Sequence, residues 1–142
     1  MKNANTKLSQ WLKGAYIDKI TYYITGWELS FTNKENEVDA VLSKIELIDP
    51  HKWAPVPPSS PIDLRDTNEY NDTLIAIVLF TVINRHPINT ISVDDKNNLI
   101  IKFENQSKIR IPSDDGMVDI TWSLKNNDDK IMECVWQKVE CN

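Results

Sequence analysis

The sequence has very few of the residues on which many catalytic and cofactor-binding sites depend. Its 142 residues include two histidines, two cysteines and three glycines. Gly14, Gly26 and Gly116 lie far apart and form no phosphate-cradling loop, which argues against nucleotide binding through such a loop. Cys134 and Cys141 are too distant for a disulfide if both lie in one strand, and no CxxC motif is present. The sequence therefore predicts no cofactor, no metal site and free thiols, as is usual in a reducing compartment.

Long apolar segments are also missing. The longest apolar run, LIAIVLFTVI at 74–83, has ten residues, whereas a membrane-spanning helix needs about 20. The N-terminal segment MKNANTKLSQWLKG lacks the apolar run of a signal peptide. We therefore expect a cytoplasmic protein that has no membrane partner.

The chain also has fewer positively charged residues than negatively charged ones, 16 against 21. The formal net charge is −5, with 41% hydrophobic and 26% charged residues, values typical of a soluble globular chain. Nucleic-acid-binding proteins usually carry a basic surface, so nucleic acid is disfavoured as a partner and a basic protein is favoured. The length fits a single domain over residues 1–142.

Alternating apolar and polar residues predict antiparallel strands with one buried face. In NNLIIKFENQSKIRIP, at 97–112, every second residue of the two predicted strands is apolar. A long helix is predicted around residues 67–84, where Asp66 and Glu69 have capping-box spacing. From Leu74 onward this helix is apolar almost all round and is therefore expected to be buried. The β-branched residues leave a strand at 75–83 as an alternative.

The order of helix and strands occurs twice along the chain. The segment LSQWLKGAYIDKIT at 8–21 can be aligned with LFTVINRHPINTIS at 79–92, although identity is low and chance remains an alternative. We predict an α+β fold of two similar helix-plus-antiparallel-meander units sharing one core, a pseudo-repeat of 5–48 and 67–124. A proline-rich connection at 49–62 separates them, and the second meander continues through four or five strands to a C-terminal strand at 130–139.

Pairs of aspartates occupy predicted turns. Because turns in a meander alternate between the two ends of the sheet, the turns holding Asp94, Asp95, Asp114 and Asp115 are expected at one end. This acidic edge is one candidate partner-binding surface, and a second is the patch formed by Glu69, Tyr70 and Asp72. The preference of aspartate for turns, or a role in solubility, is an equally simple explanation of the acidic pairs.

Two further groups of polar residues have plain structural explanations. Lys102, Lys108 and Arg110 alternate with apolar residues and resemble a solvated or edge-protecting row. His51 and His86 lie in connections between elements, and His86 directly precedes a proline. Neither histidine has the setting of a catalytic base, so an enzyme is not expected.

The run VINRHPINTISVDDKNNLIIKFENQSKIRIPSDDGMVDITW, at 82–122, resembles small bacterial immunity proteins of toxin–immunity pairs, including those of contact-dependent growth inhibition. The shared layout is a helix, a strand, an acidic turn, the pattern L-x-I-x-F-x-N/D-G, a short strand, a proline and a strand closed by an aromatic residue. The resemblance covers residues 79–124 well and 8–33 weakly. Gln106 departs from it by occupying the position of the turn glycine, and no functional residues carry over, because such proteins bind unrelated toxins through different surfaces.

The resemblance implies an immunity protein that neutralises a cognate toxin domain, such as a basic nuclease, by stoichiometric occlusion. Toxins of this class often act on nucleic acid, and an acidic protein can occupy the site of the phosphates. The alternative is a small-ligand or regulatory binding module whose apolar pocket is lined by Trp27, Trp122 or Trp136.

Overall fold

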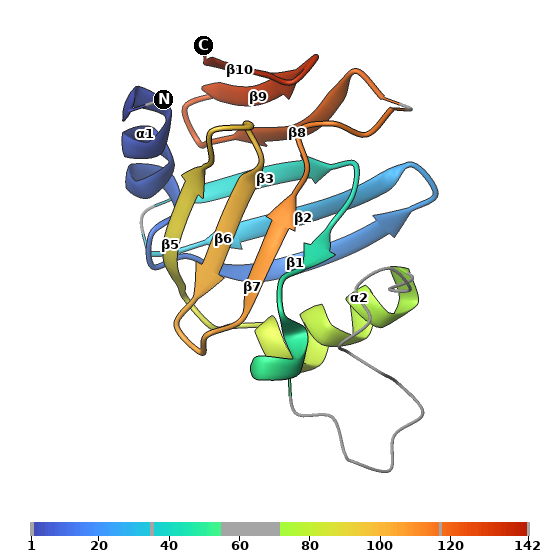
Figure 1. Ribbon diagram of the computed structural model, residues 1–142. Helices are drawn as coiled ribbons and strands as arrows, with labels where there is room; N and C mark the ends of the chain where they lie inside the picture. The colour runs from blue at the N-terminus through green and yellow to red at the C-terminus, as the bar shows by residue number, and fades with distance from the viewer. Residues whose placement is uncertain (1, 35, 55–71, 117, 142) are drawn as a thin grey trace.

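The computed structural model describes residues 2–34, 36–54, 72–116 and 118–141, and within these ranges it consists of helices and two antiparallel sheets (Figure 1). The first half contains α1 (Lys2–Leu12), β1 (Tyr16–Tyr23), β2 (Gly26–Thr32), β3 (Glu37–Leu42), β4 (Glu46–Leu47) and the 3-10 turn η1 (Pro50–Lys52). The second half contains α2 (Asp72–Val78), the π-helical turn η2 (Leu79–Ile83), β5 (Ile88–Val93), β6 (Leu99–Phe103), β7 (Lys108–Ile111), β8 (Ile120–Lys125), β9 (Ile131–Val135) and β10 (Lys138–Cys141).

The two sheets lie face to face, and their strands run crosswise (Figure 1). In the part of the chain that the structure describes, the larger sheet has the order β1-β2-β3-β8-β9-β10 and the smaller sheet has the order β4-β7-β6-β5. Helix α1 lies beside β5, and α2 lies below the smaller sheet in this view. The protein is thus mixed helix and sheet with antiparallel pairing, in agreement with the α+β class.

The core lies between the two sheets and follows the predicted alternation. On β2, Trp27, Leu29 and Phe31 are buried, and Glu28 between them is exposed. On β6, the buried residues are Leu99, Ile101 and Phe103. Each such side chain contributes about 1.5–3 kcal/mol when it is removed from water. Both sheets are therefore amphipathic, and burial of their apolar faces holds the layers together.

The expected continuous meander in the second half is wrong, because the chain changes sheets after β7. The smaller sheet receives β5, β6 and β7, whereas β8 crosses to the larger sheet and pairs there with β3. The crossing begins at Pro112 and Ser113, and the backbone N–H of Ser113 donates to Oδ1 of Asn98 at 2.9 Å and not to a neighbouring strand. Alternation shows which face of a strand is buried, but it does not select the neighbouring strand.

The described part of the predicted helix, residues 72–83, is helical but less buried than the sequence predicted. Residues 67–71 lie outside the described part of the chain, and α2 passes at Leu79 into a π-turn that Asn84 N–H closes on the Leu79 carbonyl at 2.8 Å. The side chains of Ile77 and Phe80 are 50% and 55% exposed, so the expected burial all round is wrong. The segment lies at an end of the two-layer structure, where only one of its faces meets the core (Figure 1).

The expected single strand at 130–139 is in fact the hairpin of β9 and β10, and its turn lies at Trp136 and Gln137. The turn brings the two cysteines onto adjacent strands, where both remain free thiols. Burial raises the pKa of the Cys134 thiol above its ordinary value and outweighs the opposing hydrogen bonds from Thr121 and the Gln137 backbone. A raised pKa lowers the thiolate fraction, so Cys134 is expected to be unreactive, whereas Cys141 is exposed.

Candidate functional site

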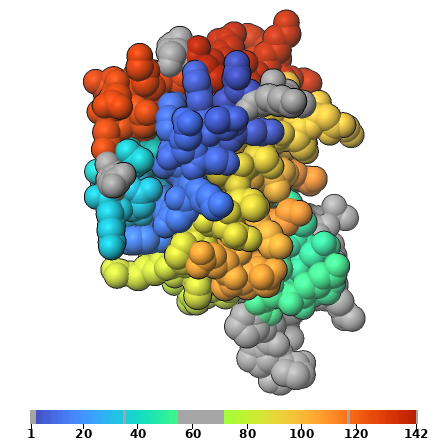
Figure 2. Space-filling model, turned by 90° about the vertical axis from the view of Figure 1, so that its left-hand side faces the viewer, coloured from blue at the N-terminus to red at the C-terminus, as the bar shows by residue number. Residues whose placement is uncertain are grey.

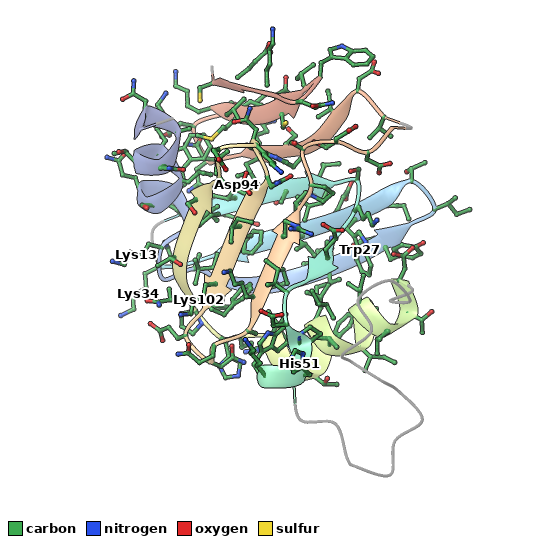
Figure 3. The ribbon with its side chains drawn as sticks, in the orientation of Figure 1. Lys13, Trp27, Lys34, His51, Asp94 and Lys102 are labelled. Carbon is green, nitrogen blue, oxygen red and sulfur yellow. The ribbon has the colours of Figure 1, made fainter. Side chains whose placement is uncertain are left out.

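Hydrogen bonds hold two acidic loops side by side at one end of the molecule. The turn at 94–98 joins β5 to β6, and the loop that begins at Ser113 follows β7. The Ser113 hydroxyl donates to the carbonyl of Lys96 at 2.7 Å, in addition to the bond from its backbone N–H to Asn98. Asp94 lies at the upper end of the smaller sheet in Figure 3. These two loops were expected at the same end of the sheet, and the structure brings them into direct contact.

The four aspartates of these loops are not equivalent. One carboxylate oxygen of Asp94 accepts hydrogen bonds from the backbone N–H groups of Lys96 and Asn98, both at 2.9 Å, and the other accepts from the Asn98 amide at 3.0 Å. Asp94 therefore stabilises its own turn. Asp95 and Asp114 are exposed and Asp115 is half-buried, so these three carboxylates are the ones available to a partner.

The hydrogen bonds to Asp94 also determine its ionisation. Partial burial alone raises the pKa of this carboxyl group, but three effects together outweigh it. These are the Asn98 side-chain bond, the backbone bonds from Asn98 and Lys96, and the positive charge of Arg110, all of which favour the carboxylate. The pKa of Asp94 consequently lies below its ordinary value, and the group is ionised at neutral pH.

An exposed tryptophan adjoins both acidic loops, at a position that the sequence pattern did not predict. The side chain of Trp136 is 70% exposed. Its backbone N–H donates to the carbonyl of Asp119 at 2.9 Å, and the amide of Asn97 donates to the carbonyl of Gln137 at 2.7 Å. The β9–β10 turn is therefore bonded to the turn at 94–98 and to the segment before β8.

This turn has an unusual backbone for its residues. Trp136 and Gln137 have φ values of 50° and 64°, so both lie in the left-handed region. A two-residue hairpin turn with two positive φ values normally contains Asn and Gly, and a bulky side chain in this region is an outlier. Positive φ at non-glycine residues is concentrated at functional sites, so the outlier marks Trp136 as a candidate functional residue.

Two further apolar side chains are exposed beside the turn. Val118 and Ile120 are 39% and 46% exposed, and Ile120 is opposite Val135, the residue before Trp136. We call the surface formed by residues 94–98, 113–116, 118–120 and 136–137 the acidic end. It carries five carboxylates (Asp94, Asp95, Asp114, Asp115 and Asp119) and one lysine, Lys96, with Lys138 next to it on β10.

Only Asp72 of the second predicted patch lies in the described part of the chain, and it is not part of the acidic end. Glu69 and Tyr70 lie outside the described residues, and Asp72 belongs to the first turn of α2. The Tyr22 hydroxyl donates to Asp72 at 2.6 Å, and the Tyr22 ring packs at a tilt against Trp27 with ring centroids 4.7 Å apart. The bond to Asp72, with minor help from desolvation and the carboxylate charge, raises the pKa of Tyr22. Asp72 thus connects α2 to β1.

Two of the three tryptophans that were candidates for lining an apolar pocket are buried in the core. Trp27 and Trp122 are 1% and 0% exposed and belong to the packed core, and the indole N–H of Trp122 donates to the carbonyl of Asn97 at 3.3 Å. Trp136 lies apart from them at the hairpin turn. Trp27 and Trp122 therefore line no surface open to a ligand, because the inner faces of β2 and β8 pack against the other sheet.

The described part of the chain was also compared with the requirements of two other kinds of site, a metal site and a membrane-spanning helix, and meets neither. These residues include no group of three or more His, Cys, Asp or Glu side chains that could hold a metal ion. None of their helices combines the length and the apolar character needed to cross a membrane. Compared with known proteins, the chain matches no protein-family model, no curated protein sequence and no solved structure. The acidic end is therefore the feature of the described residues that bears most directly on function.

Proposed function

We propose that this chain is a cytoplasmic immunity protein that binds a basic toxin domain through the acidic end and inhibits it by stoichiometric occlusion. The observation that carries the proposal is Trp136, held exposed at an unfavourable backbone conformation between two acidic loops. Tryptophan is among the residues most enriched at the energetic centres of protein interfaces. The toxin–immunity resemblance of residues 79–124 supports the same class of partner.

The charges around Trp136 favour a basic partner. Five carboxylates against Lys96 and Lys138 give the surface a negative potential, which speeds encounter with a positively charged protein and opposes nucleic acid. Trp136, Val118 and Ile120 then supply apolar area for the contact itself. A toxin that acts on nucleic acid needs a basic active site, and an acidic protein bound there excludes its substrate.

The proposal also includes a relation between the two halves of the chain. Each half contains a helix followed by three antiparallel strands, α1 with β1–β2–β3 and α2 with β5–β6–β7. This order supports the predicted pair of helix-plus-meander units, although the two meanders lie in different sheets. If the halves arose by duplication, the first half of each homologue should align with its own second half, and the offset between them should be the same in all homologues.

The test of function is a growth assay in cells that express the C-terminal region of the product encoded immediately upstream. Co-expression of this chain should restore growth, and the two proteins should purify as a one-to-one complex. Trp136→Ala should weaken the complex by about 2 kcal/mol, roughly thirtyfold, because it removes the central anchor. Phe80→Ala removes an aromatic side chain of similar exposure from η2 and should leave affinity unchanged.

Two results would count against the proposed function. The first is an upstream product that is harmless, or that still kills cells containing abundant soluble inhibitor. The second is a complex that forms equally well with Trp136→Ala and with the unaltered chain, since the partner would then bind another surface.

A further inference from the structure

A cavity of about 260 Å³ opens on the outer side of the smaller sheet, next to η1. Lys102 and Lys108 line it from β6 and β7, and Lys52 and Trp53 line it from η1 and the residue that follows. Figure 2 shows the segment around η1, in green, against the orange β6–β7 turn. Figure 3 places Lys102 toward the opposite end of the smaller sheet from Asp94. The cavity is therefore separate from the acidic end.

The two sheet lysines are placed where their charges repel. Lys102 and Lys108 are direct cross-strand partners, and both are half-buried. Like charges directly opposite on neighbouring strands are destabilising. The edge-protecting role expected for this row does not apply, because in the sheet order β4-β7-β6-β5 both lysines are on interior strands.

Arg110, on the same strand as Lys108, shows how the fold compensates a positive charge without a ligand. Arg110 Nε donates to Glu46 at 2.8 Å across the β4–β7 pair. Among the residues that the structure describes, Lys102 and Lys108 have no such carboxylate partner within 4.0 Å. Lys52 is 3.8 Å from Asp49, but both side chains are largely exposed, so this pair contributes little.

Trp53 and Gln106 also line the cavity. The indole N–H of Trp53 donates to the carbonyl of Ile48 at 2.8 Å, which holds the half-buried ring at the cavity. Gln106 adopts φ 75° in the β6–β7 turn and contributes an amide to the lining. The cavity thus combines an aromatic surface with ammonium and amide donors, while Asp49 is its only carboxylate among the described lining residues.

We infer that this cavity binds a small-molecule phosphate monoester, with the phosphoryl group between Lys102 and Lys108 and the organic part against Trp53. Three ammonium groups and one carboxylate leave two positive charges, which match a phosphate monoester of charge about −1.5 to −2 at neutral pH. Lysine binds phosphate as a point charge, and the bound dianion removes the repulsion across the strand pair. The volume suits a molecule somewhat smaller than a drug-sized ligand, which needs about 300 Å³ or more.

The test is an NMR titration of the ¹⁵N-labelled full-length chain with phenyl phosphate at low ionic strength. Shifts should be concentrated at the Trp53 indole N–H and at residues 102–108, and they should saturate. Inorganic phosphate should shift the same resonances but bind more weakly, because it lacks the ring. Benzyl alcohol, which has the ring without the charge, should have no effect.

Variants separate a specific site from general attraction of anions to lysine. Lys102→Gln and Lys108→Gln should each weaken phenyl phosphate binding by about tenfold or more, because each removes a charge-assisted hydrogen bond. Lys130→Gln, at an exposed position on the approach to β9, should leave binding unchanged. Ligand-free Lys102→Gln should unfold at a higher temperature than the parent, because the cross-strand repulsion is gone. Phenyl phosphate at the same concentration should raise that temperature less than it does for the parent.

The inference is overturned if phenyl phosphate causes no saturable shift at Trp53 in the folded parent. It is also overturned if the shifts spread over all lysines, or if Lys130→Gln weakens binding as much as Lys102→Gln. These outcomes concern the small molecule alone, so they are independent of the proposed inhibition through the acidic end.

Discussion

Asp94 illustrates how one side chain at the candidate interface contributes both to folding and to charge. Its carboxylate accepts three hydrogen bonds within the turn at 94–98, and its pKa is lowered as a result. A group whose pKa is lower in the folded state stabilises the fold above its unfolded pKa, which is about 3.9 for aspartate. That contribution is lost as the pH falls through the folded pKa.

We predict that Asp94→Ala lowers the free energy of unfolding by about 1 kcal/mol at neutral pH, a value reduced for screening by solvent. The difference from the parent should shrink as the pH falls below the unfolded pKa of about 3.9 and through the lower pKa of the folded group, because the folded carboxylate then becomes protonated. Urea unfolding at several pH values measures both effects. Asp95→Ala, at the exposed neighbouring position, should change stability by less than about 0.5 kcal/mol at any pH. A loss for Asp94→Ala that stays constant into the acid range would exclude the carboxylate charge as its cause.

At the scale of elements, the turns form with very little glycine. The chain has three glycines, and the described turns instead place several non-glycine residues at positive φ, among them Asn97, Gln106, Trp136 and Gln137. Asparagine, as at position 97, is common in this conformation, whereas tryptophan, as at position 136, is not. The backbone strain in the β9–β10 turn is therefore a cost to stability that partner binding can explain.

We predict that replacing the turn residues by the usual pair, Trp136→Asn with Gln137→Gly, raises the free energy of unfolding by about 1 kcal/mol or more. The same double variant should bind the proposed toxin partner more weakly than the parent, because it lacks the Trp136 side chain. Thermal unfolding and titration calorimetry measure the two quantities. A variant that is less stable than the parent would show that Trp136 packs against the fold and is not strained.

Gly26 is the one glycine that a close approach makes irreplaceable. It has φ 146° at the start of β2, and a Cβ there would lie 2.3 Å from the backbone carbonyl oxygen of Leu42 on β3. We predict that Gly26→Ala destabilises the protein by about 2–4 kcal/mol, because the β2–β3 pair must shift and the backbone is strained. Gly14→Ala is the matched control, since its Cβ would meet nothing within 4 Å although its φ of 82° is also positive. The denaturant midpoint of Gly26→Ala should be clearly lower than that of Gly14→Ala. Equal midpoints would show that the close approach to the Leu42 carbonyl does not affect stability.

At the scale of the whole molecule, opposite charges gather at two separate places. The acidic end carries five carboxylates, and the cavity beside η1 carries three lysines. Figure 3 shows this separation in the positions of Asp94 and Lys102. A charge distribution of this kind orients an approaching basic protein toward the acidic end before contact.

We predict that changing the four loop aspartates to asparagine together leaves the fold intact and slows association with the partner by about tenfold at low salt. The effect should fade as salt screens the charges. The control is a second quadruple variant with the same net charge as the first. It neutralises four exposed carboxylates outside the acidic end, at Asp18, Glu28, Glu37 and Glu104. Stopped-flow association rates measure both. If the two quadruple variants associate equally fast, net charge and not the acidic end determines the rate.

The sequence by itself determined the features that depend on local pattern. Alternation on β2 and β6 identified the buried residues, such as Phe31 and Phe103, because successive side chains of a strand point to opposite faces. The preference of aspartate for turns predicted where the aspartate pairs lie. Because successive turns alternate between the two ends of a sheet, the turn at 94–98 and the loop after Pro112 were predicted at the same end, where the structure places them.

Only the tertiary structure decided the features that depend on which segments meet. The transfer of β8 to the larger sheet, the exposure of Trp136 and the apposition of Lys102 and Lys108 all follow from strand pairing. Local pattern specifies the face that a strand buries, but the choice of neighbour depends on how the whole core is filled. That is why the acidic turns could be predicted, while the tryptophan beside them and the lysines at the other end could not.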